Sequence, residues 1–128
     1  MDKFLKEYDG HRFEDWGCYC SGDFKSFARK FKNYLKRNLP KEAEIVGHSC
    51  NHYELSGFIR LEAQYVYYSY TWNRCTPVKV HAAHYLNDGV LLRLAENDRD
   101  YIGKTNHYVS IAELPGMAKK FLRKEAAA

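Results

Sequence analysis

The chain has 128 residues, of which 45% are hydrophobic and 28% charged, and a net charge of +4. This length is typical of one domain with its own core, so we expect a single domain over residues 1–128. No run approaches the roughly 18–20 apolar residues that cross a membrane, and the N-terminus lacks the apolar segment of a signal peptide. These features exclude an integral membrane protein and predict a cytoplasmic one.

The two ends of the chain carry the weakest structural signals. Residues 1–16 lack a clear periodic pattern, and we expect them to be loosely ordered. Residues 126–128 are three alanines, which are typical of an expression-vector remnant and are left out of the predictions.

The strongest signal is an amphipathic helix over residues 23–38. Apolar side chains recur at helical spacing from Phe24 to Leu35, and charged side chains occupy the opposite face. Pro40 ends the helix because a proline disfavours helical geometry at the residue before it.

This helix carries most of the positive charge of the protein. Residues 21–41 hold seven Lys or Arg residues against Asp23 alone, which gives +6 locally and leaves −2 for the remainder. Such a face is either solvated or a binding surface. The candidate partner-binding residues are Lys25, Arg29, Lys32 and Lys36.

After residue 40 the pattern changes to strands. Segments rich in β-branched and aromatic residues, separated by short turns, predict an antiparallel meander over 44–50, 53–61 and 64–72. Two further predicted strands, 78–86 and 90–96, flank an Asn-Asp-Gly sequence that is typical of a hairpin turn.

The C-terminal third ends in a predicted helix. Residues 96–107 are polar and predict a loop, and Ser110 and Glu113 have the spacing of a capping box before a short helix that ends near Lys124. The expected fold class is therefore α+β. An N-terminal amphipathic helix packs on an antiparallel sheet of about five strands, and a short helix follows.

The chain contains four cysteines, Cys18, Cys20, Cys50 and Cys75. Cytoplasmic thiols stay reduced, which favours metal ligands or isolated thiols over disulfides. The helix, about 24 Å long at ~1.5 Å per residue, matches the first strand, about 23 Å at ~3.3 Å per residue. If the two pack antiparallel, Cys18 and Cys20 lie beside Cys50. The third strand of a meander ends at the same edge, which brings Cys75 there too.

A tetrahedral zinc site requires four such ligands, and a nearby helix N-terminus favours the thiolate form of cysteine. We therefore expect a structural zinc ion, with His48 or His52 able to replace one sulfur ligand. The alternatives are four incidental thiols or a redox function.

A cysteine-dependent hydrolase or transferase is the catalytic alternative. Cys20 near a helix N-terminus is a candidate nucleophile, with His84 or His107 as its base. Asn106 or Asp100 could orient the imidazole. No known signature surrounds Cys20, and the motifs of nucleotide, serine-hydrolase, metalloprotease and dinucleotide chemistry do not occur. We expect no enzyme, no catalytic residue and no small-molecule substrate.

The strand 64–72 is unusually rich in tyrosine. Its residues alternate between two faces, with Tyr65, Tyr67, Ser69 and Thr71 on one side and Val66, Tyr68, Tyr70 and Trp72 on the other. One row is expected to form the core under the basic helix. The other row, if it is exposed, would be a surface for a protein or for single-stranded nucleic acid.

Several segments resemble known proteins: FARKFKNYLKRNLP (27–40), HYELSGFIRL (52–61), the tyrosine strand and LRLAENDRDYIGKTNHYVSIAELPGMAKKFL (92–122). Over about residues 24–122 the chain resembles small proteins of bacterial phages and conjugative elements, a group that includes zinc-binding anti-CRISPR inhibitors of type II effector nucleases. The resemblance implies a non-enzymatic inhibitor that binds an RNA-guided CRISPR nuclease in the bacterial cytoplasm and blocks its DNA targeting.

One property departs from the commonest form of such inhibitors. Many are acidic mimics of DNA, whereas this chain is basic. It would therefore contact an acidic protein face or guide-bound nucleic acid. The alternative functions are a zinc-stabilised nucleic-acid-binding module and a cysteine-dependent hydrolase.

Overall fold

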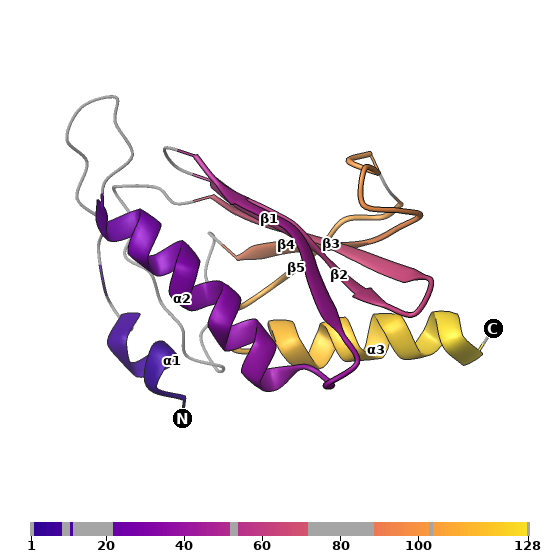
Figure 1. Cartoon of the computed structure of the whole chain (residues 1–128), viewed down its shortest axis with the longest axis horizontal. Coiled ribbons are helices and arrows are strands. Elements are labelled where there is room, and N and C mark those ends of the chain that lie inside the picture. The colour runs from indigo at the N-terminus through magenta and orange to yellow at the C-terminus, as the bar shows by residue number, and fades with distance from the viewer. Residues whose placement is uncertain are drawn as a thin grey trace.

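Helices cover one face of a five-stranded antiparallel sheet (Figure 1). The structure is a computed structural model and describes residues 2–8, 11, 22–51, 54–71, 89–102 and 104–127. Its helices are α1 (Lys3–Tyr8), α2 (Gly22–Asn38) and α3 (Leu114–Ala127). Its strands, adjacent in the sheet in chain order, are β1 (Glu44–Cys50), β2 (Glu54–Leu61), β3 (Gln64–Thr71), β4 (Val90–Ala95) and β5 (His107–Val109). The predicted α+β class is confirmed.

The fifth strand differs from the expected one. β4 pairs with β3 on one side and with β5 on the other, and both neighbours are present at Leu91 and Leu92. No edge of β4 is therefore left there for the hairpin partner predicted at 78–86, a segment that lies outside the described residues. β5 lies at the end of the predicted polar loop.

An additional helix occurs near the N-terminus. Residues 1–16 were expected to be loosely ordered, but Lys3–Tyr8 forms α1 and packs against α2. The ring of Phe4 lies 5.4 Å from that of Phe27 and 5.0 Å from that of Tyr34, measured between centroids. Phe4 and Tyr8 are both buried, so this short helix extends the core.

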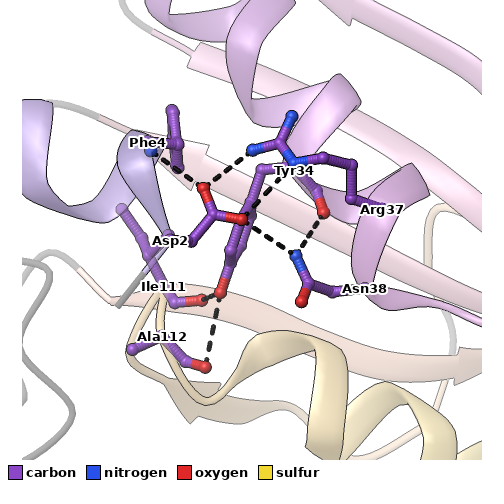
Figure 2. Close-up of polar contacts among 7 residues, drawn as sticks. All are labelled: Asp2, Phe4, Tyr34, Arg37, Asn38, Ile111 and Ala112. Carbon is purple, nitrogen blue, oxygen red and sulfur yellow. Dashed lines mark hydrogen bonds and ion pairs between the residues drawn. The ribbon is translucent and has the colours of Figure 1, made fainter.

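A polar cluster joins α1 to the last turns of α2 (Figure 2). The Asp2 carboxylate accepts a 2.8 Å hydrogen bond from the Phe4 backbone N–H and another of 2.8 Å from Arg37 Nη2. Burial opposes ionisation of Asp2, but the hydrogen bond from Arg37 and others hold the pKa of the carboxyl below its usual value. The Tyr34 hydroxyl donates to the Ile111 carbonyl at 2.9 Å, which ties α2 to the turn before α3.

The predicted capping box is confirmed in that turn. The Glu113 backbone N–H donates to Ser110 Oγ at 3.1 Å, and the Ser110 backbone N–H donates to Glu113 Oε1 at 3.3 Å. Pro115 occupies the first turn of α3, where its missing N–H has no intrahelical partner to lose. Local sequence therefore fixes the start of α3.

The core lies between α2 and the sheet. The buried residues of α2 are Phe24, Phe27, Ala28, Phe31, Tyr34 and Leu35. They belong to one cluster with the strand residues Leu55, Ile59, Val66, Tyr68, Tyr70, Val90, Leu92 and Val109. Of the two faces of the tyrosine strand, the one with Val66, Tyr68 and Tyr70 therefore faces the helices.

A bulge interrupts β1. Val46 pairs with Phe58 and Ser49 pairs with Ser56, so two residues of β1 stand opposite Gly57 alone. Gly47 adopts a φ of +66°, a conformation that a glycine accepts without strain. The extra residue shifts the alternation of β1, so that His48 reaches α2.

Gly57 leaves room for the Tyr68 hydroxyl beneath this bulge. A Cβ atom at position 57 would lie 2.5 Å from the Tyr68 hydroxyl oxygen and 3.1 Å from the Cα of His48. Both distances are shorter than ordinary van der Waals contacts. A glycine is thus required here by packing.

We expect Gly57→Ala to lower the free energy of unfolding by about 2–4 kcal/mol, because the methyl group must displace a buried hydroxyl from its partner. Gly116→Ala is the matched control, since a Cβ there meets no atom within 4 Å in the first turns of α3. It should be neutral or stabilising by about 0.5–1 kcal/mol. Urea unfolding of both variants measures the difference, and equal stability of the two would contradict the packing argument.

Candidate functional site

The four predicted partner-binding residues form one row along the outer face of α2, here called the basic row: Lys25, Arg29, Lys32 and Lys36. Their spacing of four, three and four residues places them on the same side of the helix. Lys25, Arg29 and Lys36 are exposed, and Lys32 is half-buried. The predicted exposure is therefore observed at three of the four residues, and the role of the row in binding remains a prediction.

Other basic residues of α2, on the flank that faces α1, are paired. Lys30 Nζ lies 2.6 Å from Glu7 Oε2, and Arg37 Nη2 lies 2.8 Å from Asp2 Oδ1. By contrast, no member of the basic row forms an ion pair with any residue that the structure describes. Glu7 of α1 and Asp2 just before it therefore neutralise one flank of the helix, and among the described residues the basic row is a band of positive charge.

The backbone supports part of the geometry behind the predicted zinc site. His48, near the end of β1, lies 3.0 Å from the carbonyl of Ala28 in the first half of α2, so α2 and β1 run in opposite directions. Cys50 pairs with Leu55, which pairs with Tyr70 near the end of β3. The start of α2 and the ends of β1 and β3 therefore lie toward one edge of the molecule (Figure 1).

Of the predicted zinc ligands, the structure describes Cys50 and His48. Cys18, Cys20, Cys75 and His52 lie outside the described residues, so their convergence stays a prediction. Cys50 is half-buried, and its Sγ lies 3.3 Å from the Asn51 carbonyl oxygen. Within the described ranges, no group of three His, Cys, Asp or Glu side chains is placed to hold a metal ion.

Both ring nitrogens of His48 have partners inside the fold. Nε2 lies 3.0 Å from the Ala28 carbonyl oxygen and Nδ1 lies 2.5 Å from the Tyr68 hydroxyl. A carbonyl can only accept, so Nε2 carries the proton and Nδ1 accepts from Tyr68. His48 would have to give up one of these bonds to bind a metal, which makes it a less suitable ligand than Cys50.

Burial controls the protonation of this pair. It lowers the pKa of His48, against the effect of the Ala28 carbonyl, and the positive charge of Lys32 acts in the same direction as burial. Burial also raises the pKa of Tyr68, so its hydroxyl stays protonated and able to donate near neutral pH. His48 is therefore a neutral link between α2 and the sheet.

The side of the sheet away from the helices, here called the open face, holds a second cluster. Tyr67 lies there between its cross-strand neighbours Phe58 and Arg93, with the Arg93 Cζ 4.3 Å from the centre of its ring. The ring of Tyr101 packs against Phe58 at 5.5 Å and Tyr67 at 5.9 Å. Tyr67 is therefore buried on the open face.

Arg93 is only 6% exposed although it faces away from the main core. It donates through Nη2 to the Tyr101 carbonyl, and its Nε has no hydrogen-bond partner in the described part of the chain. The stacked Tyr67 ring provides cation–π stabilisation in place of a carboxylate. The sequence pattern does not predict this cluster, because an arginine on an alternating strand is typical of an exposed position.

The described candidates for a cysteine enzyme have other contacts. The exposed His107 packs its ring on Phe121, with centroids 4.9 Å apart. Asp100 Oδ2 accepts a 3.0 Å hydrogen bond from the backbone N–H of Glu96 in its own loop. Cys20 and His84 lie outside the described residues, so the cysteine-enzyme alternative stays a prediction.

Comparisons with known proteins leave the function to be argued from these residues. No protein-family model, curated protein or solved structure matches the chain. Among the described helices, none combines the length and the apolar character that crossing a membrane requires.

The zinc prediction can be tested through Cys50. Purified protein should contain about one zinc ion per chain, and Cys50→Ser should release it and lower the free energy of unfolding by roughly several kcal/mol. Ser49→Ala, at the neighbouring exposed position, is the control and should keep the metal. Elemental analysis measures the zinc content, and wild-type protein without zinc would refute the site.

His48 predicts a pH dependence of stability. Its pKa is lowered in the folded state, so the unfolded chain binds the proton more readily, with a pKa near ~6.5. Stability should be fully present above this value and fall as the pH drops from about 7 to 5. His48→Gln keeps one donor and one acceptor, so it should flatten this part of the profile in urea unfolding. An equal slope in both proteins would contradict the assignment.

Proposed function

We propose that the protein is a non-enzymatic inhibitor that binds a type II RNA-guided CRISPR nuclease in the bacterial cytoplasm and blocks its DNA targeting. The identity of the partner rests on the resemblance of residues 24–122 to anti-CRISPR proteins. The observation that supports binding as the mode of action is the positive charge of the basic row, with which no acid in the described part of the chain forms an ion pair. The same proposal includes a structural zinc ion bound by Cys18, Cys20, Cys50 and Cys75.

The basic row is unfavourable for the isolated protein. Like charges three or four residues apart on a helix repel each other, and each pair destabilises the helix by about 0.2–0.5 kcal/mol. Acids in α1 and just before it pair with Lys30 and Arg37, yet no described acid forms an ion pair with the basic row. An acidic partner would relieve this repulsion.

The shape of the basic row suits an extended acidic surface. Lys25 and Lys36 are eleven residues apart, which is about 17 Å along the helix at ~1.5 Å per residue. An acidic face of the nuclease, or nucleic acid bound to it, could be contacted along this length. Opposite potentials would also speed the encounter of the two molecules. Inhibition by such a contact needs no turnover.

A zinc-stabilised nucleic-acid-binding module is the second candidate, because a band of positive charge also suits a phosphate backbone. The two functions differ in what the purified protein binds. For duplex DNA, four phosphate contacts would give a slope of about −3.6 when the logarithm of the binding constant is plotted against the logarithm of the salt concentration. Fluorescence anisotropy with labelled DNA or RNA in the absence of nuclease would detect this binding.

We expect the wild-type protein to suppress guide-directed DNA cleavage at near-stoichiometric amounts, and reversal of the basic row to Glu to weaken inhibition at least about tenfold through lost electrostatic contacts. Folding should be nearly unchanged, since exposed charges alter stability by less than ~0.5 kcal/mol each. The readout is the concentration of protein that halves cleavage by a purified type II nuclease loaded with guide RNA.

A matched control reverses four exposed lysines outside the basic row: Lys3, Lys6, Lys41 and Lys120. This control has the same net charge as the row variant, so it separates the position of the charge from its amount. Equal inhibition by both variants would exclude the basic row as the contact. Unaffected cleavage at a large excess of wild-type protein would reject the inhibitor function.

A further inference from the structure

Three exposed apolar side chains lie on the open-face side of the sheet and are here called the tyrosine patch: Tyr101, Ile102 and Tyr108. These are the large hydrophobic residues most exposed in the described ranges, at 61%, 89% and 63%. Tyr108 alternates with the buried Val109, so it projects from the open face, where it pairs with Leu91. The segment 96–102 lies on the same side of the sheet, away from α3 (Figure 1).

The segment that carries Tyr101 and Ile102 is held by its own hydrogen bonds. The backbone N–H of Arg99 donates to Asn97 Oδ1 at 2.8 Å, and that of Glu96 donates to Asp100 Oδ2 at 3.0 Å. Arg93 anchors the Tyr101 carbonyl from below. The tyrosine patch is therefore presented in an ordered position, which lowers the entropic cost of binding.

The charges around the tyrosine patch are of both signs. Glu96, Asp98 and Asp100 alternate with Arg99 along the segment, and Lys104 follows. In a two-fold interface, residue i of one copy meets residue j of the other, so a mixed rim can pair acids with bases. A polyanion such as nucleic acid would be repelled by the three acids. The basic row, in contrast, cannot pair with itself.

We propose that the tyrosine patch is the centre of a two-fold symmetric homodimer of this chain. The apolar side chains of one copy would pack against those of the second, and the acidic and basic rim residues would face each other across the axis. Because the helices lie on the other face of the sheet, each copy would still expose its basic row. The dimer is independent of the proposed nuclease partner.

Light scattering and sedimentation equilibrium of the full chain, over about 1 to 100 μM, test this directly, since the dimeric fraction rises with protein concentration. Ile102→Asp should raise the dimer dissociation constant at least about tenfold, because it places a charge in a buried apolar contact. Its thermal unfolding at low concentration should match wild type, since Ile102 is 89% exposed. Asn33→Asp, at an exposed position of α2 outside the basic row, changes the net charge by the same amount and is the matched control.

The rim provides a second and independent measurement. Asp98→Lys and Arg99→Glu should each weaken the homodimer, and a mixture of the two variants should dimerise more tightly than either alone, because opposite rims then meet. A wild-type protein that is monomeric up to about 100 μM would overturn the proposal. Equal effects of Ile102→Asp and Asn33→Asp, or no gain on mixing, would overturn the assigned surface.

Discussion

Burial of the aromatic face of α2 against the sheet is the contact on which the rest of the structure depends. Phe27 and Phe31 lie over Tyr70 and Tyr68, which fixes the rotation of the helix about its axis. One flank then meets α1, and the other carries the basic row past β1. The exposure of that row is therefore a consequence of core packing, because turning the row inward would expose the phenylalanines and bury the charges.

A polar link is built into this apolar contact. His48 connects the Ala28 carbonyl of α2 to the hydroxyl of Tyr68 in the centre of the sheet. Burying such groups costs free energy unless each finds a partner, and here every one does. Because the bonds form in only one register of β1, the link also favours the bulged alignment over a regular strand.

Local patterns predicted the elements that local interactions determine. The amphipathic period of α2, the strand-type composition of β1, β2 and β3 and the capping box at Ser110 are each encoded within a few residues, and all were predicted. The elements missed were α1 and β5, with six and three residues, which are too short for a periodic signal. They exist because tertiary packing and an adjacent strand stabilise them.

The candidate sites were predicted unevenly for the same reason. Exposure of the basic row follows from helical spacing alone, whereas burial of Arg93 requires a distant loop to fold over β4, and no local pattern encodes that. The zinc prediction used topology, and its backbone premise, antiparallel packing of α2 on β1, is observed. Three of its four cysteines, Cys18, Cys20 and Cys75, lie outside the described residues. The packing behind the prediction is therefore observed, and the convergence of the four cysteines stays a prediction.

The basic row and the tyrosine patch differ in chemistry and lie on opposite sides of the sheet. The basic row has one sign of charge, so its attraction acts at long range and weakens with salt. The tyrosine patch combines exposed apolar side chains with mixed charge, so its contacts act at short range and depend on shape. Because the sheet and its core separate them, a ligand on one leaves the other accessible. A chain that self-associates through the patch would therefore present two basic rows to one partner, and the second contact would form at a high effective concentration.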